Sequence, residues 1–93
     1  MAFTLPSMSI MGSQRFVYII RSSAKPANFY TGLTSHVAER VAAHNAGRCR
    51  HTANAKPWDL VVAIEFVSEH RAIAFEKYLK SGSGVAFSKR HFR

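Results

Sequence analysis

The strongest constraint on the fold lies near the N-terminus, where two short β-type segments flank one turn. Residues 15–21 are β-branched and aromatic with an arginine at each end, a pattern typical of a mostly buried strand. Residues 22–28 contain a lysine, a proline and an asparagine and predict a turn. Residues 29–33 predict a second short strand, so the two segments are expected to form an antiparallel hairpin with a long loop.

A helix and a third strand are predicted after the hairpin. Ser35 as N-cap and Gly47 as C-terminal stop bound a helix over about residues 36–46. Residues 48–57 are cationic and polar and predict a loop, and the apolar run 58–67 predicts a third, central strand.

The C-terminal third predicts two more helices. Ser68 is a candidate N-cap for a helix that ends near Lys80, where the glycine- and serine-rich residues 81–84 break it. Residues 85–92 predict a short final helix. The order β-β-α-β-α-α indicates an α/β fold, an α+β sandwich with a small three-stranded antiparallel or mixed sheet flanked by helices. One face of that sheet is expected to be covered and the other left for a ligand.

The length bounds the domain organisation. Ninety-three residues suffice for one modest core, and we expect a disordered tail at residues 1–14 and a single domain over 15–93. No run of about 18 apolar residues predicts a membrane span. The single cysteine, Cys49, excludes an internal disulfide and fits a reducing compartment, so a cytoplasmic location is expected.

The charge balance indicates a polyanionic partner. The chain has 13 Lys and Arg against 5 Asp and Glu, a formal net charge of +8. Such a charge favours nucleic acid through steering and counterion release. No segment pairs an apolar face with a Lys/Arg-rich face, which argues against a membrane surface. The alternative is that the charge only keeps the domain soluble.

Glu76 falls on an apolar helical pattern. With Ala72, Phe75 and Leu79 it follows the i, i+3, i+4, i+7 spacing of one helix face. An ionised carboxylate there needs a cation or several donors. A functional carboxylate, a salt bridge to a nearby arginine and a position at the edge of the stripe all fit this spacing.

Arg40 and His44 are one turn apart on the predicted helix 36–46, so both side chains can point at one ligand. The planar donor fork of arginine matches phosphate oxygens, and a histidine can position water or move a proton. The alternative is that Arg40 pairs with Glu39 or Glu76 and that His44 is exposed.

Two tyrosines lie on the predicted hairpin. Tyr18 and Tyr30 are on neighbouring strands and can lie side by side, with Gly32 leaving room for a close approach. A phenol with a pKa of about 10 is a poor base unless cations or a metal stabilise its phenolate. Amphipathic packing is the more common role of a tyrosine on a strand.

The acidic residues limit the kinds of metal site. The chain has only Glu39, Asp59, Glu65, Glu69 and Glu76. No carboxylate cluster suits a two-metal site built from protein alone, and no His/Cys spacing suits zinc. One carboxylate with a largely hydrated Mg²⁺ fits, because that ion takes its remaining ligands from water and phosphate.

In chain order, these residues are Phe16-Val17-Tyr18, Tyr30-Thr31-Gly32, Arg40 with His44, and Glu76 within the run Phe75-Glu76-Lys77-Tyr78-Leu79-Lys80-Ser81-Gly82. The ordered set resembles the GIY-YIG nuclease domain family over residues 15–93. It looks most like small standalone bacterial members related to excision-repair endonucleases.

The resemblance implies a metal-dependent DNA endonuclease. Nothing in the sequence looks like a base-reading helix, so selection of DNA structure rather than sequence is expected. The resemblance implies that Tyr30 is the general base for water, that Tyr18 supports it near the phosphate, and that Arg40 stabilises the transition state. It also implies that His44 assists proton transfer or water positioning and that Glu76 holds one Mg²⁺ or Mn²⁺.

The chain departs from the family pattern at several positions. The first triad lacks its glycine and isoleucine, and Thr31 replaces an isoleucine in the second. Leu33 stands where many relatives carry a lysine, which questions the rate more than the reaction. Asn54 is expected to contact phosphate from the loop 48–57.

The remaining basic residues are expected to follow the DNA backbone. They are Arg48, Arg50, Lys56, Lys77, Lys80, Lys89, Arg90 and Arg93, and they imply strongly salt-dependent binding. The expected partners are DNA in a bacterial-type nucleoid and a possible targeting protein. Two alternatives stay open: a nucleic-acid-binding module of the same fold with weak or no cleavage, and a basic protein–protein adaptor.

Overall fold

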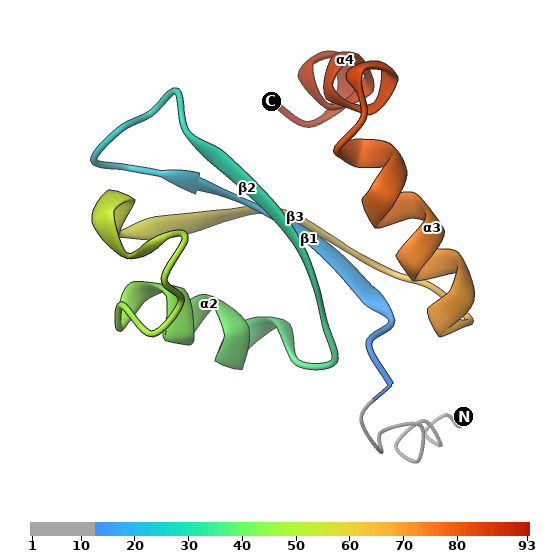
Figure 1. Cartoon of the computed structure of the whole chain (residues 1–93), viewed down its shortest axis with the longest axis horizontal. Helices are drawn as coiled ribbons and strands as arrows, with labels where there is room; N and C mark the ends of the chain where they lie inside the picture. Colours follow the sequence, from blue (N-terminus) through green and yellow to red (C-terminus); the bar gives the residue numbers. More distant parts are fainter. Residues whose placement is uncertain (1–12) are drawn as a thin grey trace.

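The predicted hairpin forms the centre of the sheet in the computed structural model, which describes residues 13–93. β1 (Phe16–Ser22) pairs antiparallel with β2 (Phe29–Thr34) on one side. β3 (Trp58–Glu65) pairs antiparallel with the other edge of β1. The strand order is therefore β2-β1-β3 (Figure 1). The predicted three-stranded sheet and the order β-β-α-β-α-α are confirmed.

The expectation that the third strand is central is wrong, because β3 is an edge strand. Four successive residues of β1, from Val17 to Ile20, are at most 1% exposed. A strand buried on both faces belongs in the middle of a sheet. The apolar run of β3 is less buried, and Leu60 within it is 46% exposed.

Both faces of the sheet are covered, which corrects the expectation of one open face. α2 (Val37–Asn45) packs against β1 and β3, while α3 (Glu69–Leu79) packs against β1 and β2. α4 (Gly82–His91) packs against α3. Figure 1 shows α2 on one side of the sheet and α3 and α4 on the other. The site must therefore lie between elements rather than on a bare sheet.

The ends of the first two helices follow local capping chemistry. The N-cap of α2 is His36 rather than the expected Ser35, and the Thr34 hydroxyl accepts the His36 N–H at 3.1 Å. Gly47 has φ +76° just after the helix, a conformation that suits glycine, so the predicted stop is confirmed. The predicted cap at Ser68 is also confirmed, since its side chain accepts the Arg71 N–H.

The stretch predicted to break the second helix follows the end of α3, as expected, and it also begins α4. Ser81 is its N-cap and accepts the Gly84 N–H at 3.2 Å, so α4 starts three residues before the predicted residue 85. A Cβ at Gly84 would overlap the carbonyl of Tyr78. Glycine is therefore needed here for α4 to cross closely over the end of α3.

Residues 1–12 of the predicted tail lie outside the described residues. At the edge of the domain, the Gln14 N–H donates to Glu69 Oε2 at 3.0 Å. Between residues 13 and 93, no helix has the length and apolar character needed to span a membrane.

Candidate active site

Tyr18 lies at the centre of the site because a glycine on β2 leaves space for its ring. Tyr18 pairs with Gly32 across the β1–β2 ladder. A Cβ at Gly32 would lie 2.6 Å from the Tyr18 hydroxyl oxygen. The missing side chain thus makes room for the phenol beside β2, as the sequence predicted.

A buried chain of hydrogen bonds runs from Tyr18 into the loop after α2. The Tyr18 hydroxyl lies 2.7 Å from His44 Nε2, and His44 Nδ1 lies 2.6 Å from Thr52 Oγ1. All three residues are at most 1% exposed. The alternative of an exposed His44 is therefore wrong.

The donors of this chain can be assigned from its far end. The Thr52 hydroxyl donates to the carbonyl of Cys49 at 3.3 Å, so its oxygen is free to accept from Nδ1–H of His44. Nε2 is then left without a proton and accepts from the Tyr18 hydroxyl. Burial and the charge of Arg40 lower the pKa of His44, which favours this neutral ring. Both ring nitrogens are occupied, so His44 positions Tyr18.

Arg40 joins the chain from the solvent side. Burial raises the pKa of the Tyr18 phenol, and the hydrogen bond and charge of Arg40 oppose that rise. The same hydrogen bond raises the pKa of Arg40. Tyr18 therefore stays protonated at neutral pH and donates to His44 while Arg40 holds its oxygen. The alternative pairing of Arg40 with a glutamate is not what the structure shows.

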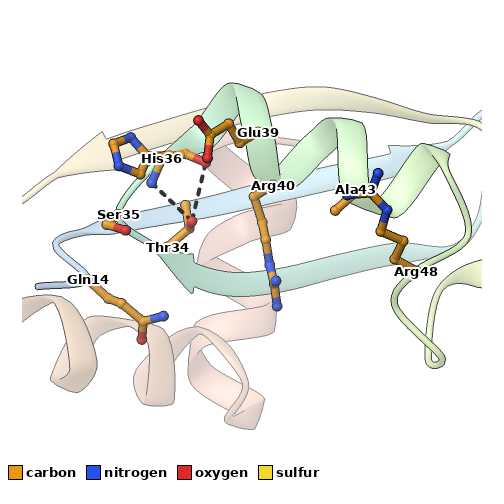
Figure 2. A pocket seen from close by; sticks show the side chains of 8 residues that line it. All are labelled: Gln14, Thr34, Ser35, His36, Glu39, Arg40, Ala43 and Arg48. Atoms are coloured by element: carbon orange, nitrogen blue, oxygen red, sulfur yellow. Dashed lines mark hydrogen bonds between the residues drawn. The ribbon is translucent and has the colours of Figure 1, made fainter. Parts of the chain in front are cut away.

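The guanidinium of Arg40 also lines an open pocket of about 350 Å³. Figure 2 shows Arg40 extending from α2 into this space, and Arg48 folding back from the loop after α2 with its guanidinium beside Ala43. The full lining is Gln14, Thr34, Ser35, His36, Glu39, Arg40, Ala43 and Arg48. Two arginines in one polar pocket make a suitable place for a phosphate group.

Tyr30 completes the aromatic part of the site. Its ring centroid lies 6.3 Å from that of Tyr18 and 5.1 Å from that of His44. Tyr30 is only partly buried, whereas Tyr18 is fully buried. Of the two phenols, Tyr30 is the one that solvent and a substrate can reach.

Glu76 approaches this group from α3 through Lys80. The Lys80 ammonium lies 2.5 Å from Glu76 Oε2 and 6.0 Å from the centroid of the Tyr30 ring. The Glu76 side chain is 13% exposed and that of Lys80 is 54% exposed. The partner of Glu76 is thus a lysine on its own helix, not the arginine considered from the sequence.

The residues around Glu76 fit one type of divalent cation. No group of three or more Asp, Glu, His or Cys gathers within the described part of the chain, so no closed protein cage is available. The single carboxylate of Glu76 suits a largely hydrated hard cation that takes oxygen ligands from water and phosphate. Glu76 is the residue that would hold it.

The other predicted DNA contacts divide into two groups. Arg48 shares the pocket of Arg40, and Arg93 lies 4.0 Å from the Phe29 ring centroid in a second pocket of about 400 Å³ that Tyr30 also lines. The rest are exposed and are not brought together with the tyrosines: Arg50, Asn54 and Lys56 on the loop after α2, Lys77 on α3, and Lys89 and Arg90 in the last turn of α4.

The sequence missed two residues of the site. Thr52 comes from a loop without periodicity, so no spacing could connect it to His44. Lys80 was assigned to the DNA-binding surface, although its i, i+4 spacing from Glu76 was a usable sign of an ion pair. Leu33 packs on the apolar cluster of the α3 face, across the sheet from Tyr18.

Comparison with known proteins decides the family. A model described as the GIY-YIG catalytic domain matches residues 14–87. The chain belongs to the GIY-YIG family. The family predicted from the residues is thereby confirmed, and with it membership of a class of catalytic nuclease domains. The match contains every residue assigned to the tyrosine and glutamate site.

Curated relatives of this GIY-YIG domain include two kinds of protein. A structure-specific endonuclease subunit slx1 of Aspergillus oryzae is 39% identical over 64 residues, which are 63% of this chain and 16% of that protein. A UPF0213 protein of Staphylococcus haemolyticus is 35% identical over 72 residues, 76% of this chain and 85% of that protein. The chain thus spans only a small part of the endonuclease subunit. No solved structure matches it.

Proposed function

We propose that this GIY-YIG domain is a divalent-metal-dependent endonuclease that hydrolyses phosphodiester bonds in branched or otherwise structured DNA. The observation that carries the proposal is the buried chain from Tyr18 through His44 to Thr52, with Arg40 at its open end. A domain that only packs aromatic rings has no use for a fixed phenol held between an arginine and a neutral histidine.

Tyr30 is the residue proposed to take the proton of the attacking water. It is the more accessible phenol, and the Lys80 ammonium lies 6.0 Å from its ring centroid. In the proposed step Tyr30 acts as its phenolate: water attacks phosphorus and gives its proton to the phenolate oxygen. The bond to the leaving sugar oxygen breaks, and that oxygen takes a proton from solvent.

Tyr18 is proposed to support the reaction rather than to accept the first proton. Its hydroxyl hydrogen is directed at His44, and its oxygen meets Arg40. Tyr18 therefore fixes the guanidinium relative to Tyr30. Preorganised donors of this kind are among the largest contributions to catalysis of reactions that develop negative charge.

Arg40 and Glu76 divide the stabilisation of the phosphate. Arg40 binds non-bridging oxygens as charge develops on them. Glu76 is proposed to hold one Mg²⁺ or Mn²⁺, which supplies Lewis-acid stabilisation of the phosphate and of the leaving oxygen when bound. His44 keeps Tyr18 oriented, so its effect on proton transfer is indirect.

The substrate preference is proposed from the charge and the relatives. The exposed cations bind the backbone without reading bases, and the slx1 proteins are named structure-specific endonuclease subunits. The word subunit also supports a second protein that supplies targeting. DNA as substrate places the protein in the compartment of the chromosome, with which the free thiol of Cys49 is compatible.

The test is a cleavage panel with end-labelled duplex, flap, junction and single-stranded DNA in Mg²⁺, Mn²⁺ or EDTA. Glu76→Ala is assayed beside the wild type, and DNA binding is measured for both. We expect metal-dependent cuts on at least one branched substrate that vanish in the variant while binding persists. Salt-sensitive binding without any cut by the wild type would establish the alternative, a binding module of the same fold.

A further inference from the structure

Lys80 interacts with both Glu76 of α3 and Tyr30 of the β1–β2 hairpin. Its ammonium contacts Glu76 Oε2 and faces the Tyr30 ring. A lysine that only follows the DNA backbone from outside would have no reason to lie between the metal-binding candidate and the candidate base. Its position therefore requires an account that links both residues.

Glu76 needs Lys80 when no other cation is near. The carboxylate is largely buried, and an ionised group at such a depth is costly without a partner. Among residues 13–93, Lys80 is the only ion-pair partner recorded for it. A divalent cation would use the same carboxylate, so metal and ammonium compete for one ligand.

Lys80 can leave without unfolding anything. Its side chain is about half exposed and lies at the C-cap of α3, on a flexible four-carbon stem. Once displaced, the ammonium has lost its counter-charge and remains beside Tyr30. A phosphodiester bound at the site carries a negative charge that can replace the Glu76 carboxylate as the partner of the Lys80 ammonium.

We propose that Lys80 holds Glu76 until a divalent cation takes its place, and that the released ammonium then binds a non-bridging oxygen of the scissile phosphate. This rests on the proposed nuclease function. Bound metal releases Lys80 from Glu76, so that its ammonium can bind DNA phosphate. Bound DNA holds the Lys80 ammonium away from Glu76, so that the carboxylate can bind metal. Each ligand therefore strengthens the binding of the other. Thermodynamic linkage requires the coupling to be equal in both directions.

The test measures Mn²⁺ binding by isothermal titration calorimetry, first without DNA and then with a phosphorothioate flap that resists cleavage. Lys80→Met keeps the length of the stem and removes the charge. Arg71→Met removes the same charge from the same helix, at an exposed position that lines a separate pocket with Phe66 and Tyr78. Glu76→Gln identifies the heat that belongs to this site.

Without DNA, we expect Lys80→Met to bind Mn²⁺ about two- to fivefold more tightly than the wild type, the range for releasing a part-exposed ion pair. Arg71→Met should match the wild type. With DNA, the wild type should gain Mn²⁺ affinity, and Lys80→Met should gain less.

Without DNA, equal Mn²⁺ affinities of Lys80→Met and the wild type would overturn the proposed competition between Lys80 and metal. The competition would also be overturned if the heat of Mn²⁺ binding persisted in Glu76→Gln. An equal DNA-induced gain in both proteins would overturn the phosphate contact. These outcomes are independent of cleavage, so a wild type that shows the expected affinities and cuts no DNA would refute only the nuclease function.

Discussion

The two faces of the sheet are built from alternate residues of the same strand and have different roles. On the α3 face, Val17 and Ile19 pack with Ala72 and Leu79 in an apolar cluster. On the α2 face, Tyr18 is equally buried and packs with Ile20 and Trp58, and its hydroxyl is also hydrogen-bonded to His44. Burial thus stabilises the fold on both faces, and on the α2 face it also fixes a chain of polar groups.

The comparison teaches that burial alone does not separate core from site in a small domain. What separates them is whether buried polar atoms are satisfied by one another in a chain that reaches solvent. The chain through Tyr18 ends at exposed Arg40, whereas the α3-face cluster contains no such path. Substitutions in the polar chain should therefore lower the cleavage rate, whereas substitutions in the α3-face cluster should lower stability and leave the rate unchanged.

The largest effect is expected for Arg40→Ala. Loss of a preorganised donor to a charged transition state typically lowers the rate by about 10²–10³-fold. Because Arg40 is exposed, the free energy of unfolding should change by less than about 1 kcal/mol. Single-turnover cleavage and urea denaturation check the two quantities, and a loss of stability with an intact rate would contradict this role.

Gly32→Ala should lower the stability of the domain and displace Tyr18. The new methyl would meet the Tyr18 hydroxyl, and overpacking of this kind costs about 1–3 kcal/mol. Gly82→Ala is the matched control, since no atom lies within 4 Å of its added Cβ. Thermal denaturation of both variants should show a loss at position 32 only, and equal melting temperatures would refute the close approach.

Adjacent positions on β1 give the sharpest contrast between the faces. Tyr18→Phe leaves buried His44 Nε2 without its donor, which should cost about 1–3 kcal/mol of stability and also lower the cleavage rate. Ile19→Val should cost about 0.5–1.5 kcal/mol through lost packing and leave the rate unchanged. Urea denaturation and single-turnover rates together decide, and a rate loss at Ile19 equal to that at Tyr18 would remove the distinction.

The smallest effect is a pH dependence that belongs to His44. Its pKa is lowered in the folded state by burial and by Arg40, so the unfolded chain binds its proton more readily. The stability from the neutral ring is complete above the unfolded value of about 6.5 and is lost as pH falls through and below it. Tyr18 and Thr52 are hydrogen-bonded to the ring, and the Tyr30 ring also packs beside it.

Chemical denaturation from pH 8 to pH 5 checks this dependence in the wild type and in His44→Gln. The stability advantage of the wild type should shrink toward acidic pH. A difference between the two proteins that stays constant across the range would show that His44 does not titrate as described.

Much of the fold was readable because it follows local rules. The caps at Ser68 and Gly47 and the helical spacing of Arg40 and His44 depend only on nearby residues. The strand order could not be predicted from the sequence. Residues 58–67 are as apolar as β1, and only tertiary packing decides which of the two runs is buried on both faces. The start of α4 was missed because it depends on Gly84 meeting the end of α3.

The site was predictable to a similar degree. Tyr18, Tyr30, Arg40, His44 and Glu76 could be selected from spacing and from the family resemblance. The role of His44 could not, because its second partner, Thr52, lies on an irregular loop. Which nitrogen carries the proton depends on a hydrogen bond to the backbone of Cys49, and that bond has no signature in the sequence.

The central claim is that Tyr30 acts on the attacking water, and two tyrosine variants test it directly. Tyr30→Phe removes the hydroxyl in the site, and Tyr78→Phe removes one from an exposed position of α3. Single-turnover cleavage of a labelled flap at saturating Mg²⁺ and DNA is the measurement. The proposal predicts a loss of about 10²–10⁴-fold for Tyr30→Phe and wild-type rates for Tyr78→Phe. Equal rates in all three proteins would contradict it.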